Sequence, residues 1–328
     1  MGRGTDRLER WRAVRLPWGL LGALLALVLA CERAEPAAAP EPADATLEVR
    51  REAAARRGIE WLITRKDAMG PDWAFAIFSY LDPIVRDPAL AARCRAKLDE
   101  VVRVPLASLP AGFQDPELLR LPRLRLIVAE LLRRKRAGEP WEEAAAALEA
   151  LLERHHQEFW VSAPLLQQLT FLHGFSELGI EPRRTLDDVV RAIRARWAQG
   201  DPELMFRNAG FMLALTHVFY TASGYLTRSP DPAAFGPELE MLRRALRHYL
   251  TAPVPPQRHF LDVQAEVLLA LEVLRVPEDD DMRAMSERLL GLQNPDGSWG
   301  EASGNHDAHA TIVAVQALLE PPAELRRP

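Results

Sequence analysis

Helix-like segments of two compositions alternate along this chain from Leu47 onward. One kind is amphipathic and rich in Arg and Glu, and comprises residues 47–66, 87–102, 139–157, 184–199, 234–252 and 279–294. The other kind is apolar nearly all round, as in DWAFAIFSYL, HFLDVQAEVLLALEVL and AHATIVAVQALL. A helix that is apolar on every face must be enclosed by other parts of the protein. The alternation therefore predicts enclosed helices, each paired with a half-exposed one.

Breaker residues divide this part of the chain into about twelve segments, and no convincing run of two-residue alternation marks a strand. The segments begin near Leu47, Asp72, Asp87, Asp115, Pro140, Ala163, Arg184, Asp201, Pro232, His259, Glu278 and Asp307. About six enclosed helices alternating with six half-exposed ones predict an all-α fold, an (α/α)6 toroid, over residues 47–320. The fourth segment fits least well because it contains Pro122 and many Arg.

Two turns at opposite ends of the predicted toroid carry complementary sequence motifs. RGIEWL at 57–62 resembles the first half of the QW repeat of squalene-hopene cyclases and related toroids, and QNPDGSWG at 293–300 resembles the second half. Lys66 stands where the first copy would have Gln, and Leu289 replaces the aromatic residue of the second. The resemblance implies a toroid whose ends meet, with structural turn roles for Trp61, Gln293, Gly297 and Trp299. The alternative is a plain Asn-Pro-Asp-Gly turn with an exposed Trp.

Two acidic residues interrupt the apolar segment HFLDVQAEVLLALEVL. Asp262 and Glu266 are four residues apart and therefore share one helical face near the start of the segment. Two buried carboxylates persist only beside a cation, a metal, a hydrogen-bond donor or water. Structural pairing, with Arg258 or a histidine of another enclosed helix, and a ligand or metal role both remain open.

His309 begins the last apolar segment, in GNHDAHATIVAVQALL. A His followed by a small residue and an apolar run resembles the zinc-binding His of protein prenyltransferase β-subunits. The resemblance implies a zinc site in which Asp262 stands for the family's Asp, but no Cys lies near Asp262. Imidazole with one or two carboxylates is a workable metal set, so zinc is a possible cofactor. The alternative for His309 is a hydrogen-bonded or exposed side chain at a helix start.

His217 is the third candidate, in LALTHVFYTASGYL. A His inside an apolar helix is more often a satisfied core residue than a ligand. If the helix starts at Pro202, His217 lies roughly 22 Å along it, too far from its start to meet Asp262. His217 joins Asp262, Glu266 and His309 only if this helix breaks near Gly210.

The N-terminal residues read as an export signal and a tether. A basic stretch precedes about fifteen apolar residues, fewer than the roughly 20 needed to span a bilayer. The stretch ends in Val-Leu-Ala-Cys, which resembles a bacterial lipobox and implies lipidation, with palmitate among the acyl groups, at Cys31. We therefore expect a signal peptide over 1–30, an Ala/Pro/Glu-rich tether over 31–46 and a tail over 321–328. Ordinary secretion and an uncleaved anchor are the alternatives.

The net charge and the predicted export of the protein limit the kinds of function that we expect. Removal of residues 1–30 changes the net charge from −5 to about −8, which argues against nucleic acid as a partner. We expect a lipoprotein of the bacterial envelope, facing the periplasm or exterior, whose toroid cavity binds a small, partly apolar ligand, with or without a metal. A toroidal envelope enzyme, either lyase- or hydrolase-like toward polysaccharides or a metal-dependent transferase, is the first alternative. A non-catalytic scaffold is the second.

Overall fold

A computed structural model describes residues 45–81, 84–102, 116–251, 260–300 and 305–319. These residues form helices, with no strand among them, so the fold is all-α as predicted. The longer helices are α2 (Leu47–Arg65), α3 (Pro71–Leu81), α4 (Pro88–Val102), α5 (Leu121–Ala137), α6 (Glu142–Arg154), α7 (Leu165–Glu177), α8 (Leu186–Gln199), α10 (Ala209–Ala222), α11 (Gly236–Thr251), α12 (Phe260–Val273), α13 (Asp280–Gly291) and α14 (Asn305–Leu318). No helix within the described ranges is long and apolar enough to cross a membrane.

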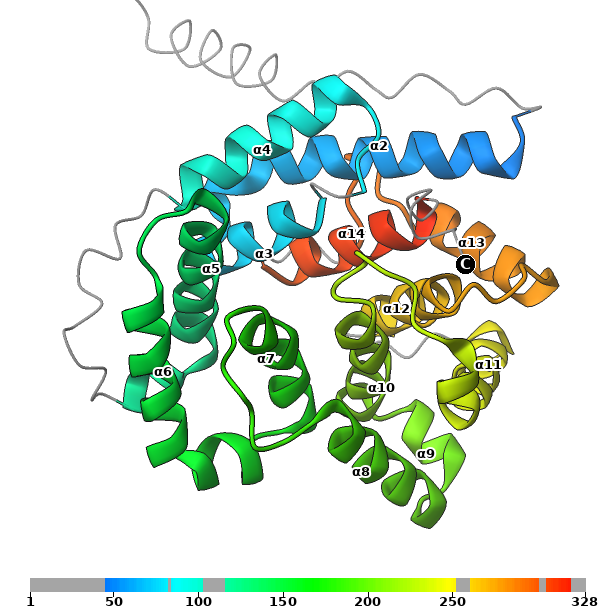
Figure 1. Ribbon diagram of the computed structural model, residues 1–328. Helices are drawn as coiled ribbons and strands as arrows, with labels where there is room; N and C mark the ends of the chain where they lie inside the picture. Colours follow the sequence, from blue (N-terminus) through cyan, green and yellow to red (C-terminus); the bar gives the residue numbers. More distant parts are fainter. Residues whose placement is uncertain (1–44, 82–83, 103–115, 252–259, 301–304, 320–328) are drawn as a thin grey trace, which may run out of the picture. The chain divides into compact units, whose positions relative to one another are not determined.

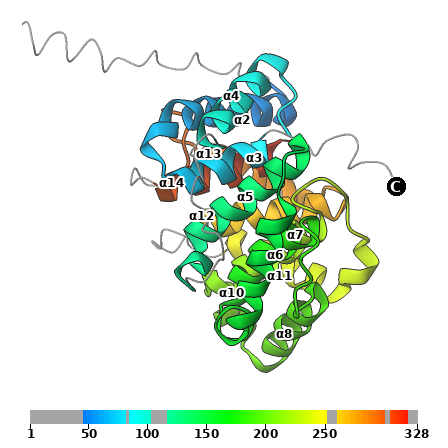
Figure 2. The ribbon, with the colours of Figure 1, turned by 60° about the vertical axis from the view of Figure 1, so that its left-hand side comes forward.

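The apolar helices pack against one another in chain order. Each helix in the order α3, α5, α7, α10, α12 and α14 contacts the next one, and α14 also contacts α3 (Figures 1 and 2). Helices α2, α4, α8 and α11 pack against α14, α3, α10 and α12 respectively. Burial follows this division, because twelve of the fourteen residues of α12 are buried, against six of nineteen in α2. The circuit of contacts is compatible with an α/α toroid.

Two of the expected segments are each split into two helices. In the fourth, a short 3-10 helix (Pro116–Leu119) precedes α5, which places Pro122 in the first turn of α5, where a missing N–H costs nothing. In the eighth, α9 (Pro202–Phe206) ends before Asn208, and α10 begins after it. The Asn208 side chain accepts a hydrogen bond from the Phe211 N–H at 3.0 Å, so it caps a new helix.

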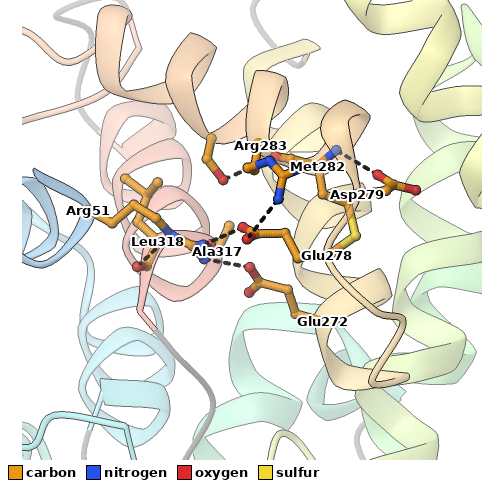
Figure 3. A network of polar contacts seen from close by, with 9 residues as sticks. Arg51, Glu272, Glu278, Asp279, Met282, Arg283, Ala317 and Leu318 are labelled. Atoms are coloured by element: carbon orange, nitrogen blue, oxygen red, sulfur yellow. Dashed lines mark hydrogen bonds and ion pairs between the residues drawn. The ribbon is translucent and has the colours of Figure 1, made fainter. Parts of the chain in front are cut away.

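Helix α2 is tied to α12 and α14 by Arg51 (Figure 3). Its guanidinium donates to the backbone oxygens of Ala317 and Leu318 at the end of α14 and pairs with Glu272 of α12 and with Glu278. Carbonyl groups at a helix C-terminus have no partner within the helix and carry partial negative charge. Arg51 therefore satisfies the end of α14 and fixes α2 against it.

The two motif-bearing segments lie against each other in this seam, but residues 57–62, with Trp61, lie within helix α2 and not in a turn, whereas residues 293–300 follow α13. Arg57 of α2 donates to Oε1 of Gln293, whose amide in turn donates to the backbone oxygens of Ala54 and Gly297. Trp61 Nε1 donates to Asp296 at 3.0 Å. Trp299 is fully buried, so the alternative of an exposed Trp in a plain turn is wrong. These contacts hold α2 against the segment that follows α13.

Candidate functional site

Helix α12 carries two acidic side chains into the interior. Asp262 and Glu266 are 2% and 0% exposed, one turn apart on the same face. Charged carboxylates so deeply buried are costly unless other groups satisfy them. The neighbouring helices α10 and α14 supply those groups.

His309, on α14, lies between the two carboxylates. Its Nδ1 is 2.9 Å from Asp262 Oδ2 and its Nε2 is 3.7 Å from Glu266 Oε1. Burial by itself lowers the pKa of this imidazole, but the hydrogen bond and charge of Asp262, with the charge of Glu266, raise the pKa above its ordinary value. Asp262 therefore orients the ring and favours its protonated form.

His217 reaches the same cluster because the eighth segment breaks at Asn208. Its Nδ1 lies 2.8 Å from the backbone oxygen of Leu213 and 3.5 Å from Glu266 Oε2. A carbonyl oxygen only accepts, so Nδ1 carries a proton and donates to Leu213. The neighbouring Thr216 hydroxyl donates to Glu266 Oε2. All four residues singled out in the sequence thus lie together, and Thr216 is an addition that sequence analysis missed.

A cavity of about 40 Å³ adjoins this cluster. Glu266, His217 and His309 form its polar side, whereas Asp262 lies behind His309 and does not line it. The rest of the wall is aromatic and aliphatic: Trp73, Ala76, Ile77, Tyr80, Tyr220, Tyr225, Leu226, Ile312 and Val313, with Gln316 as one further polar residue. Trp73, Tyr80, His217 and His309 are only partly buried, so the cavity reaches the surface there.

The backbone that brings Tyr225 to this wall is strained. Gly224, Tyr225 and Leu226 all have positive φ, at 58°, 53° and 69°. A left-handed conformation costs a residue other than Gly about 1–2 kcal/mol, so tertiary contacts must hold these residues in place. Tyr225 donates its hydroxyl to the Thr170 backbone oxygen at 3.0 Å and stacks on Tyr80 with ring centroids 5.2 Å apart. Sequence analysis missed Tyr225, although a Gly just after an apolar helix is typical of such a turn.

Two polar atoms of the cavity wall have no hydrogen-bond partner among the described residues. They are Glu266 Oε1 and the Tyr220 hydroxyl, both on well-buried side chains. Burial and the charge of Glu266 raise the pKa of Tyr220 well above its ordinary value, so the phenol keeps its proton. Buried polar atoms of folded proteins are normally satisfied, and both atoms adjoin space that water or a ligand can fill.

The cluster does not fit a zinc centre. No group of three or more His, Cys, Asp or Glu side chains in the described ranges is positioned to hold a metal ion. His309 Nδ1 and His217 Nδ1 are both used in hydrogen bonds, to Asp262 and to Leu213. A zinc ion bound by protein needs at least three converging donors at about 2.0–2.3 Å. The four side chains form a hydrogen-bonded and ion-paired chain in place of a coordination shell.

Comparisons with known proteins supply no family. No protein-family model matches the sequence, and neither a curated protein nor a solved structure matches it. The resemblance to cyclases and prenyltransferases therefore rests on the residues of the two motif-bearing segments and on His309. Cys31, the predicted lipidation site, lies outside the described residues.

Proposed function

We propose that this protein is a lipid-anchored protein of the bacterial envelope that binds a small, partly apolar ligand inside an α/α toroid. The toroid is supported by the circuit of contacts from α3 round to α14 and by the seam between α2 and α14. The envelope location is supported by the basic and apolar N-terminus that ends at Cys31.

The observation that carries ligand binding is the composition of the cavity wall. Aromatic rings and the aliphatic side chains of Ile77, Ile312 and Val313 line the cavity together with the carboxylate of Glu266 and two imidazoles. Small-molecule sites in proteins combine a mostly apolar wall with a few converging polar groups. Glu266 Oε1, which lies 3.7 Å from His309 Nε2, and the Tyr220 hydroxyl have no hydrogen-bond partner among the described residues, so they are the polar atoms that a ligand would satisfy.

The same cavity argues against a purely structural scaffold, since the helices leave space beside a charged cluster.

An enzyme is the second candidate, and the Asp262–His309 hydrogen bond is what favours it. The carboxylate of Asp262 is hydrogen-bonded to Nδ1 of His309, so Nε2 of the same ring is available to exchange a proton with a ligand. General acid–base catalysis by histidine needs this arrangement.

A thermal-shift screen of small, partly apolar compounds tests the binding proposal. We expect compounds that stabilise the parent protein to lose their effect in Ala76→Leu, because the added carbons occupy the cavity beside Ala76. The control is Ala147→Leu, the same change on the partly buried face of α6, away from the cavity. The proposal fails if the compounds stabilise Ala76→Leu as strongly as the parent, or if no compound stabilises the parent.

A further inference from the structure

We infer that the polar group the cavity recognises is a hydroxyl, so that the ligand is a small alcohol with an apolar body. The inference rests on the proposed function and concerns the gap between His309 and Glu266. His309 Nε2 and Glu266 Oε1 face each other across 3.7 Å, longer than a hydrogen bond. One oxygen that lies about 2.8 Å from each atom closes the gap.

A group that bridges His309 Nε2 and Glu266 Oε1 must accept a hydrogen bond from the first atom and donate one to the second. Glu266 Oε1 is a carboxylate oxygen and only accepts. The imidazole of His309, with Nδ1 held by Asp262, offers a donor at Nε2 in its protonated form. A hydroxyl accepts from Nε2 through its oxygen and donates its proton to Oε1. The adjacent Tyr220 hydroxyl, which lacks a partner among the described residues, can donate to the second lone pair.

Other polar groups fit this gap less well. A ketone accepts from His309 but leaves Glu266 Oε1 without a donor. A carboxylate meets the negative charge of Glu266 at short range, whereas an ammonium group cannot accept from His309.

Water alone would fill the polar gap, but it would not use the rest of the cavity. Ile77, Leu226, Ile312 and Val313 lie on its wall beside three tyrosine rings. Apolar surface of this kind gains free energy when carbon atoms replace water against it. A cavity of about 40 Å³ holds the hydroxyl and the first carbons, and the partly buried Trp73 and Tyr80 border the remainder of the ligand.

A matched set of five-membered rings tests the inference: cyclopentanol, cyclopentanone, cyclopentylamine and cyclopentanecarboxylate. Dissociation constants for the full-length protein are measured by ligand-observed NMR titration. We expect cyclopentanol to bind at least about tenfold more tightly than each of the others, because each of them leaves a buried charged group unsatisfied or repelled.

The variant Glu266→Gln gives a second readout within one protein. Its amide N–H can donate to a ketone, so the preference for cyclopentanol over cyclopentanone should fall to within about threefold. The control Glu130→Gln alters a buried carboxylate of α5 that does not line the cavity, and should keep the parent's preference. If Glu266→Gln does not fold, the ranking in the parent protein alone decides.

The outcomes separate the two proposals. Equal binding of the four compounds, or tighter binding of the ketone, the amine or the acid, overturns the hydroxyl inference and leaves ligand binding in place. If none of the four binds at its solubility limit and the thermal-shift screen also finds no compound, both proposals fail.

Discussion

Asp262 Oδ2 on α12 and His309 Nδ1 on α14 lie 2.9 Å apart, although they are separated by 47 positions in the sequence. The pair joins two helices of the inner circuit that are otherwise apolar along most of their length. It is also the contact through which the protonation of one imidazole is linked to folding.

The stability of the protein should depend on pH through this pair. The pKa of His309 is raised above 6.5 in the folded protein, so its protonated form contributes stability that is complete below about pH 6.5 and is lost as the pH rises through the raised pKa. Asp262→Asn removes the charge that raises the pKa. Urea unfolding should therefore show that the advantage of the parent over Asp262→Asn is greatest below about pH 6.5 and shrinks as the pH rises through the raised pKa of His309.

The control for this measurement is Glu203→Gln. It removes the carboxylate 3.0 Å from His248, in an ion pair whose glutamate is largely exposed. Because exposed ion pairs contribute little, its unfolding free energy should stay close to the parent's. A difference between the parent and Asp262→Asn that is constant or grows with pH would contradict the assignment.

Asn208→Ala should destabilise the protein by about 1 kcal/mol, because the Phe211 N–H at the start of α10 loses its side-chain acceptor. Asn208→Asp keeps an acceptor at the same place and should recover most of the loss. Denaturant unfolding of the three proteins measures both changes. If Asn208→Ala were as stable as the parent, the break between α9 and α10 would not depend on this cap.

Much of the helix order follows from local sequence chemistry. The starts expected near Arg184 and Asp201 lie within two residues of the observed starts of α8 and α9, because Thr185 and Asp201 cap the helices that follow them and Pro202 lies in the first turn of α9. The grouping of Asp262 with Glu266 was likewise predictable from their four-residue spacing.

The rest of the site depends on contacts between distant segments. The left-handed conformation of Tyr225 and Leu226 is unfavourable locally and is held by Tyr80 and the Thr170 carbonyl, which no local pattern indicates. Thr216 resembles any other small residue of an apolar helix until the structure places its hydroxyl against Glu266. Whether His217 would join the cluster depended on one break, at Asn208.

Gly58→Ala tests the seam between α2 and α14. A Cβ at this position would lie 2.6 Å from Val315 Cγ2 and 2.8 Å from Trp299 Cζ3, closer than carbon atoms tolerate. We expect a loss of about 1–3 kcal/mol in unfolding free energy, since the buried Trp299 must shift. The matched control is Gly291→Ala at the end of α13, where a Cβ meets nothing within 4 Å. That variant should equal or exceed the parent in stability, and equal losses in the two would contradict the close approach.

Elemental analysis of protein purified without a chelator tests the zinc hypothesis carried by the resemblance to prenyltransferases. We expect zinc well below one equivalent. His309 Nδ1 is already hydrogen-bonded to Asp262, and no three His, Cys, Asp or Glu side chains of the described residues are placed to bind one metal ion. His309→Ala should hold the same trace amount as the parent. Near-stoichiometric zinc that disappears in His309→Ala would make the cluster a metal site.

Membrane attachment should depend on one of the two cysteines. A chain that ends its apolar N-terminal stretch at Cys31 is expected to be acylated there, whereas Cys94 is buried in α4 and inaccessible. Cells that express the parent, Cys31→Ser or Cys94→Ala are grown with radioactive palmitate and fractionated. We expect label and membrane association in the parent and in Cys94→Ala, and neither in Cys31→Ser. Label retained by Cys31→Ser would show that the lipid is elsewhere, and an unlabelled parent that is still exported would favour ordinary secretion.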